Sequence, residues 1–233
     1  MSTSRADQVE APWHALLSRL RLRRGAVLCA LVAACAGCTS IVSAPEQPTL
    51  FDLGPLPAPA AAPADAAAPL VLPELEASGL LDRRSILYRL DYGDGRALLP
   101  YGASRWSAPV AELVHERIAA HLARERTVLR PGEMTAVARA GAQAPQVLRL
   151  QLQEFAQHFD APGRSHGRVR VLATLLQSSP TGDRLLGQRA FRVSAPAPTG
   201  DAAGGVAALS QAVDALALQL GQWLQEHSGR RAP

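Results

Sequence analysis

Three consecutive stretches of alternating apolar and polar residues constrain this fold more than any other feature of the sequence. They cover residues 147–159, 168–177 and 185–194, and Pro162-Gly163 and residues 179–183 supply turn residues between them. Successive side chains of an extended chain point to opposite faces, so each stretch has one apolar face and one polar face. The sequence therefore predicts a three-stranded antiparallel meander with one face buried.

The first of these strands changes phase near its middle. Leu148, Leu150 and Leu152 share one face, whereas Phe155 would fall on the polar face of a regular strand. An extra residue in one strand, a β-bulge, can turn such an aromatic side chain back toward the core. We therefore expect a bulge or bend near Phe155.

Shorter strands are expected before the meander. Residues 70–75 form an apolar run, and residues 85–92 alternate, with Ile86, Tyr88 and Leu90 on one face. The turn Tyr-Gly-Asp-Gly that ends at Gly95 can return the chain into a partner strand over residues 97–101. A further short strand is expected at residues 128–130.

Two stretches have the helical spacing of apolar residues. In the first, Ser107 is expected to cap the helix and Pro109 to lie in its first turn, where a missing N–H costs nothing. The second covers residues 206–227. The predicted fold is α+β in two layers, a mostly antiparallel sheet with two helices packed on one face. The two apolar stripes consist of Val110, Leu113, Val114, Ile118 and Leu122, and of Val206, Leu209, Val213, Leu216, Leu220 and Leu224.

The N-terminal segment has the order of an export signal. Arginines at 19–24 precede an apolar run of about 12 residues, which is shorter than the ~20 residues that a spanning helix needs. Cysteine in the cleavage region indicates a lipoprotein signal. Two lipidation sites fit: Cys35, preceded by Val-Ala-Ala, and Cys38, preceded by Ala-Gly with an unusual cysteine before them. Neither following residue is the aspartate that retains lipoproteins in the inner membrane, so we expect a periplasm-facing lipoprotein of a Gram-negative outer membrane.

Three regions follow from these features. Residues 1–37 are predicted to be the signal peptide and lipidation motif, residues 38–69 an Ala/Pro-rich tether, and residues 70–228 the domain. Removal of the basic leader leaves a domain of nearly neutral charge, which disfavours nucleic-acid binding. All three cysteines precede residue 39, so the domain holds no disulfide framework.

No pattern of catalytic residues is found. His115 and His121 are six residues apart on a helix, which does not place them on one face as a zinc pair. His158 and His166 flank a turn and are expected to be solvated. Arg168 and Arg170, which alternate with Val169 and Val171, are expected to lie on a solvated sheet face. A phosphate or anionic-lipid groove is the less favoured interpretation. We therefore predict a protein that is not an enzyme and needs no cofactor or metal.

One set of spaced residues is more specific for a protein family than the features above. The Tyr88-Arg89 pair in a strand is followed by Tyr101, Arg105-Trp106 and Pro109 at the start of a helix. The run Phe-Asp-Leu-Gly-Pro at 51–55 lies shortly after the lipidation region. Together with a closing helix that contains Trp223, these residues resemble the ABC-type transport auxiliary lipoprotein family over residues 49–226.

The resemblance implies a role rather than a reaction. Such lipoproteins accompany an ABC permease and ATPase and a mammalian-cell-entry (MCE) type substrate-binding protein, and they assist the movement of lipids or hydrophobic compounds across the envelope. Their domain is similar in fold to the N-terminal domain of TolB. The alternative is an adaptor lipoprotein that is not tied to an ABC transporter, and self-association is left open.

Tyr101, Arg105 and Trp106 form a candidate partner-docking patch, because these residue types dominate interface energetics. A structural role is the favoured alternative. In that interpretation, Trp106 fixes the helix start to the core and Arg105 pairs locally.

Overall fold

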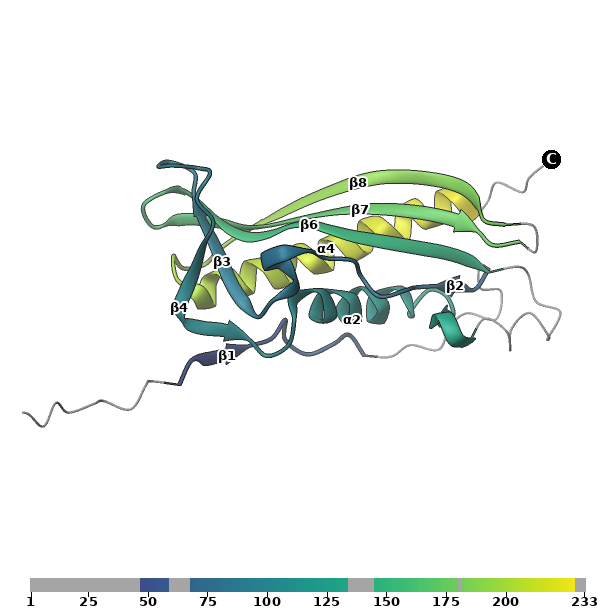
Figure 1. Ribbon diagram of the computed structural model, residues 1–233, viewed down its shortest axis with the longest axis horizontal. Coiled ribbons are helices and arrows are strands. Elements are labelled where there is room, and N and C mark those ends of the chain that lie inside the picture. Colours follow the sequence, from purple (N-terminus) through teal and green to yellow (C-terminus); the bar gives the residue numbers. More distant parts are fainter. Residues whose placement is uncertain (1–46, 59–67, 134–144, 180–181, 229–233) are drawn as a thin grey trace, which may run out of the picture. The chain divides into compact units, whose positions relative to one another are not determined.

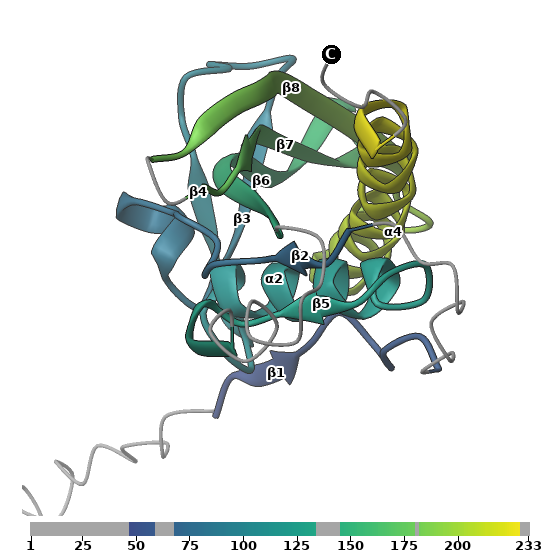
Figure 2. The ribbon, with the colours of Figure 1, turned by 90° about the vertical axis from the view of Figure 1, so that its right-hand side faces the viewer.

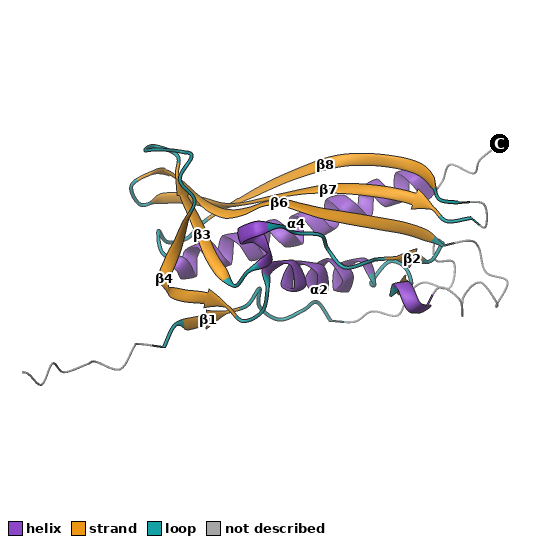
Figure 3. Ribbon diagram, viewed as in Figure 1, coloured by secondary structure: helices purple, strands orange, loops and turns teal. Residues whose placement is uncertain are grey.

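A computed structural model describes residues 47–58, 68–133, 145–179 and 182–228 of the chain. Eight strands form one sheet, and two long helices lie beneath its three longest strands (Figure 1). Figure 3 shows the same arrangement by type of element, with short 3-10 helices between the strands. The α+β fold expected from the sequence is confirmed. The elements are β1 (Thr49–Phe51), β2 (Leu70–Val71), η1 (Gly79–Asp82), β3 (Ser85–Leu90), β4 (Leu99–Trp106), α2 (Val110–Leu122), β5 (Val128–Leu129), η2 (Pro131–Glu133), β6 (Gln146–Ala161), β7 (Arg164–Gln177), β8 (Arg184–Pro196) and α4 (Ala202–Ser228).

The predicted meander is present as β6, β7 and β8, which pair antiparallel over almost their whole length. The register of β6 against β7 shifts between Leu152 and Glu154, which confirms the bulge expected near Phe155. Strand β7 begins four residues earlier than expected. Gly163 has a φ of 74°, a left-handed conformation that suits glycine and makes the β6–β7 turn tighter than the sequence suggested.

Parallel pairing is more frequent than expected. Strand β6 is flanked on one side by β7 and on the other by β2 at its start and β3 at its end, and both of these run parallel to it. The short pairings of β1 with β4 and of β2 with β5 are also parallel. The description "mostly antiparallel" therefore holds for the long pairings, including the predicted β3–β4 pairing, and not for the short ones.

The folded part begins earlier than the expected boundary at residue 70. Strand β1 pairs with β4, and Leu53 is buried in the core although both lie in the stretch expected to be tether. The centre of that tether, residues 59–67, lies outside the described residues, as do Cys35 and Cys38.

Both helices keep their predicted apolar stripes, but their starts differ from the prediction. The capping residue of α2 is Pro109 itself, whose carbonyl accepts the N–H groups of Glu112 and Leu113. Ser107 does not cap this helix, because it lies two residues before the cap position, where its N–H still pairs with the Phe51 carbonyl in extended structure. Helix α4 begins at Ala202, four residues before the expected start, since the Asp201 carboxylate accepts the Gly204 N–H at 2.8 Å.

Figure 2 shows both helices on the same side of β6, β7 and β8. One hydrophobic core joins that inner face of the sheet to both helices. Helix α4 packs closest where small residues permit it. A Cβ added at Gly167 of β7 would lie 2.6 Å from the backbone nitrogen of Leu209 in α4. This glycine therefore sets how closely the helix approaches the sheet.

Candidate functional site

The residues expected to dock a partner have structural roles in this conformation. Trp106 is 1% exposed and packs against Phe155, with ring centroids 5.6 Å apart. The Nη1 of Arg105 donates hydrogen bonds to the carbonyls of Tyr101, Gly102 and Ser104. These contacts correspond to the structural alternative weighed from the sequence, and Trp106 offers no surface to a partner.

Tyr101 is half-buried and also contacts the fold. Its hydroxyl donates to Gln157 Oε1 at 2.7 Å, and its ring lies 4.8 Å from that of Tyr88. Burial, with a smaller contribution from the charges of Tyr88 and Asp201, raises the pKa of Tyr101 to about 12. The hydroxyl therefore stays protonated as a donor at neutral pH.

Three polar side chains, Arg117, His121 and Asp214, connect the two helices to the start of the folded part, and we call them the helix network. Arg117 donates from Nε and Nη2 to the two carboxylate oxygens of Asp214 at 2.6 and 2.8 Å. His121 lies 2.7 Å from the same carboxylate. The remaining Arg117 nitrogen, Nη1, donates to the carbonyl of Leu53. Arg117 therefore fixes the Phe-Asp-Leu-Gly-Pro segment to both helices.

The charge balance of this network is reflected in the pKa of Asp214. Burial alone would raise it, but hydrogen bonds from Arg117 and His121 outweigh burial and lower it. A bidentate arginine–carboxylate contact of this kind is among the stronger polar interactions in proteins. The sequence did not reveal this network, because Asp214 lies 97 residues from Arg117 and 93 from His121.

A second group of polar side chains, which we call the sheet network, lies on the outer face of the sheet. It consists of Asp91, Glu154, His158 and Arg168. His158 is 2% exposed, and its two ring nitrogens lie 3.0 Å from Asp91 Oδ2 and from Glu154 Oε1. The expectation that His158 is solvated is therefore wrong.

His166 and Arg168 complete the surroundings of His158. The ring of His166 stacks on that of His158 with a centroid distance of 5.6 Å, so His166 is not a freely solvated residue either. Arg168 donates to His166 Nε2 at 2.9 Å, and its Nη1 lies 3.7 Å from Glu154. Hydrogen bonding to His158 lowers the pKa of Glu154 despite burial, and the charges of His158, Arg168 and Arg192 add to this effect.

A groove runs along α2 on another part of the domain. It consists of two adjoining hollows of about 510 and 440 Å³, which share Leu72, His115, Glu116 and Arg130 as lining residues. His115 Nε2 is buried there and forms no hydrogen bond. Apolar side chains form most of the combined lining, whereas four exposed carboxylates line the first hollow and one of them also lines the second. The groove carboxylates are Glu74, Asp82, Glu112 and Glu116.

The groove carboxylates have no ion-pair partner among the described residues, and Arg130 is the one basic side chain in the lining besides His115. The groove therefore combines a mostly apolar lining with exposed acidic side chains in its first hollow. Such a surface suits a segment that carries both apolar and basic side chains.

In the part of the chain that the structure describes, no group of three or more His, Cys, Asp or Glu side chains is placed to hold a metal ion. Helix α4 is long and apolar enough, by length and composition, to cross a membrane. Its apolar stripe is buried in the core, which accounts for that composition.

Comparison with known proteins agrees with the resemblance. The family model described as ABC-type transport auxiliary lipoprotein component matches residues 51–221. The crystal structure of protein XCC0632 from Xanthomonas campestris is similar to this chain with a TM-score of 0.57 and 18% identity, and the match covers 77% of this chain and 96% of that one. A second crystal structure, of an uncharacterized protein, matches with a TM-score of 0.57, 12% identity and coverage of 77% and 99%.

These two structures support the fold, while the family model covers well over half of the chain. A search of curated protein sequences found no match. Neither the family description nor the two neighbours indicate an enzyme, and the family description places its members among lipoproteins that serve ABC transport. The chain belongs to the ABC-type transport auxiliary lipoprotein component family.

Proposed function

We propose that this lipoprotein is held at the outer membrane, faces the periplasm and docks a subunit of an MCE-type ABC transport system that moves lipids or hydrophobic compounds. The observation that carries the proposal is the groove along α2. Its apolar lining and its carboxylates, which pair with no described residue, suit a partner segment with apolar and basic side chains. The partner is the MCE-type substrate-binding protein or the permease of the system.

The helix network supports this geometry. Leu56 lines the groove and lies directly after the segment that Arg117 holds against the helices. The groove therefore lies next to the segment through which the chain enters the domain.

Photo-crosslinking in cells tests the docking surface. A photoreactive residue at Ala120, in the groove, is expected to capture a transporter subunit, whereas one at Gln151, on the outer face of the sheet, is not. Glu116→Arg is expected to reduce capture at least tenfold, because it places a like charge against a basic partner segment. Glu226→Arg makes the same charge change at an exposed position on α4 and serves as the matched control.

Equal capture from both positions, or capture of envelope proteins without any transporter subunit, would contradict the proposal. The latter result would favour the adaptor function outside ABC transport. Lipid attachment is tested separately by mass spectrometry of Cys35→Ala and Cys38→Ala, of which one alone is expected to lose the acyl groups. Membrane retention of a variant that lacks both cysteines would exclude the lipid anchor.

A further inference from the structure

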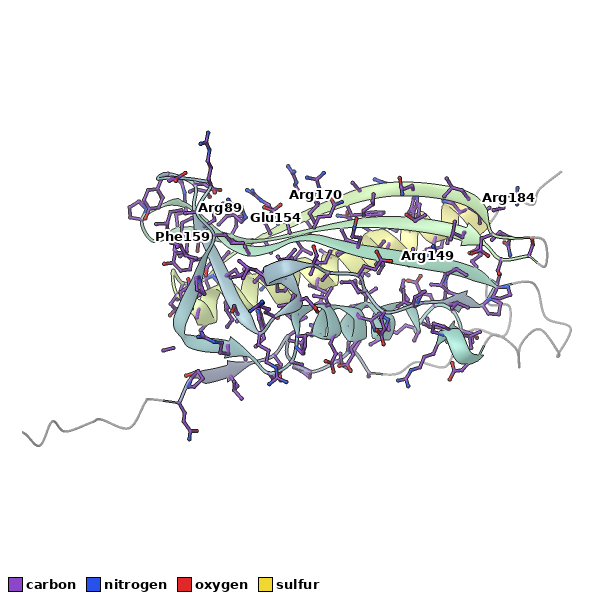
Figure 4. The ribbon with its side chains drawn as sticks, in the orientation of Figure 1. Arg89, Arg149, Glu154, Phe159, Arg170 and Arg184 are labelled. Atoms are coloured by element: carbon purple, nitrogen blue, oxygen red, sulfur yellow. The ribbon has the colours of Figure 1, made fainter. Side chains whose placement is uncertain are left out.

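Arginines gather on the outer face of the sheet next to the bulge in β6. Glu154 of β6, Arg170 of β7 and Arg192 of β8 lie opposite one another in a single cross-strand row. Arg168 occupies the next row on the same face. Figure 4 shows Glu154 and Arg170 projecting from the same side of the sheet, away from the helices.

Two of these three arginines form no direct contact with a carboxylate of the described residues. Arg168 contacts Glu154 at 3.7 Å and donates to His166. Arg170 and Arg192 form neither a hydrogen bond nor an ion pair with any described residue. Glu154 faces Arg170 and interacts with the charge of Arg192, but its single negative charge is shared among three arginines and His158, so a net positive charge remains on this part of the face.

The direct opposition of Arg170 and Arg192 is unfavourable for folding. Like charges at facing positions of an antiparallel pair destabilise a sheet, since their Cβ atoms are only about 4.5–5.5 Å apart. Each guanidinium presents several N–H donors in a planar fork that matches the oxygens of a phosphate or carboxylate. The guanidinium groups of Arg170 and Arg192, on adjacent strands, can donate hydrogen bonds to the same tetrahedral anion. The negative charge of that anion would offset the repulsion between the two arginines.

We propose that Arg170 and Arg192, with Arg168 beside them, form a binding site for a phosphate group, the chemistry that phospholipid headgroups and free phosphate share. The site lies on the outer sheet face and uses none of the residues that line the groove along α2. It deepens the proposed function by assigning a phosphate-bearing ligand to a protein proposed to serve lipid transport. Its own test does not depend on a transporter partner.

Binding is measured in detergent-free buffer with the full chain carrying Cys35→Ala and Cys38→Ala, so that neither detergent nor an acyl chain determines vesicle association. Inorganic phosphate is titrated by calorimetry, and vesicles of phosphatidylcholine with or without phosphatidylglycerol are tested by co-flotation. The chain with Arg170 and Arg192 intact is expected to bind the vesicles that contain phosphatidylglycerol. The double variant Arg170→Gln/Arg192→Gln in the same background is expected to bind them at least tenfold more weakly.

Arg149→Gln is the matched control, because Arg149 lies on the same face but is 3.8 Å from Asp183. It is expected to change binding less than twofold. Phosphate binding that the double variant loses, without vesicle binding, identifies free phosphate as the source and supports the site. Unchanged binding of both probes by the double variant overturns it.

An acidic protein surface is the competing occupant. If a photoreactive residue at Gln151, on the outer sheet face, captured a protein, and the double variant lost that capture while phosphate and vesicle binding stayed intact, the arginines would belong to a protein contact. That result would overturn the proposal. Failure of the phosphate site leaves crosslinking from Ala120 unaffected. The two proposals can therefore fail independently.

Discussion

The helix network and the outer sheet face that carries the sheet network contain the same kinds of side chain but differ in how many of their arginines are paired. In the helix network, Asp214 accepts two hydrogen bonds from Arg117 and contacts His121, and the remaining Arg117 donor meets backbone carbonyls. In the sheet network, His158 lies between two carboxylates, while two arginines beside it have no partner among the described residues.

The difference separates polar groups that hold the fold together from polar groups that remain available. Arg117 is 8% exposed, so its charge needs the partners that surround it. Arg170 and Arg192 lie at the surface, where water can solvate a charge without a protein partner. Selection for folding alone explains the first arrangement, whereas the second retains a repulsion that folding does not require.

The largest effect is expected when the helix network loses its carboxylate. Asp214→Ala leaves Arg117 buried without its counter-ion, which should cost about 2–3 kcal/mol of unfolding free energy, somewhat below the loss for a fully buried pair. Urea denaturation of the wild-type chain and of Asp214→Ala measures the difference in unfolding free energy. Asp183→Ala removes a carboxylate from an exposed pair at 3.8 Å and should cost less than about 0.5 kcal/mol. Equal losses would show that the helix network is no more important to folding than a surface pair.

The next effect concerns the inner face beneath the sheet network. Gly167→Ala places a Cβ within 3.0 Å of backbone atoms of Ala208 and Leu209, so α4 or β7 must shift. Overpacking of this kind should lower the unfolding free energy by about 1–3 kcal/mol. Gly102→Ala, where a Cβ meets no atom within 4 Å, should leave thermal unfolding nearly unchanged. A tolerated Gly167→Ala would mean that the helix is not fixed against this strand.

Lowering the pH should destabilise the fold through one carboxyl group in each network, Asp214 in the helix network and Glu154 in the sheet network. The pKa values of Asp214 and Glu154 are lowered by folding, so each group stabilises the protein above its ordinary pKa, and that stability is lost as the pH falls through the lowered value. The unfolding free energy should therefore decrease below about pH 4–4.5, where unfolded Asp and Glu begin to bind protons.

Asp214→Asn should flatten this acid dependence more than Glu154→Gln, because Asp214 accepts a bidentate arginine and Glu154 lies 3.7 Å from its nearest one. Denaturant unfolding between pH 3 and pH 7 provides the comparison. An identical profile in all three proteins would place the acid sensitivity elsewhere in the chain.

The smallest effect has the opposite sign. Arg192→Gln should raise the unfolding free energy by about 0.2–0.5 kcal/mol, since it removes the like charge that faces Arg170. Arg170→Gln should gain less, because Arg170 also faces the Glu154 carboxylate, and the double variant should gain little more than Arg192→Gln alone. Thermal unfolding in low salt is the sensitive measurement. A loss of stability in Arg192→Gln would mean that this arginine has a structural contact that the fold depends on.

For Tyr101, Arg105 and Trp106, residue type alone did not distinguish a docking patch from packing against the core. Tyr, Arg and Trp favour interfaces, yet the same amphipathic side chains also pack well at the edge of a core. Trp106 follows the second option because β4 extends to this residue and turns its ring toward Phe155. No local feature of the sequence distinguishes the two outcomes, since the deciding contact comes from a strand 49 positions further along the chain.

The sequence by itself determined the meander, the bulge, the two amphipathic helices and the family, because these depend on periodicities and spacings within short segments. Tertiary structure alone decided the parallel pairings of β1, β2 and β3, the burial of His158, the helix network and the groove along α2. Each of these brings together residues that are distant in the chain, and their contact energy depends on burial and on charges supplied by other elements. A pattern within one segment carries no information on either quantity.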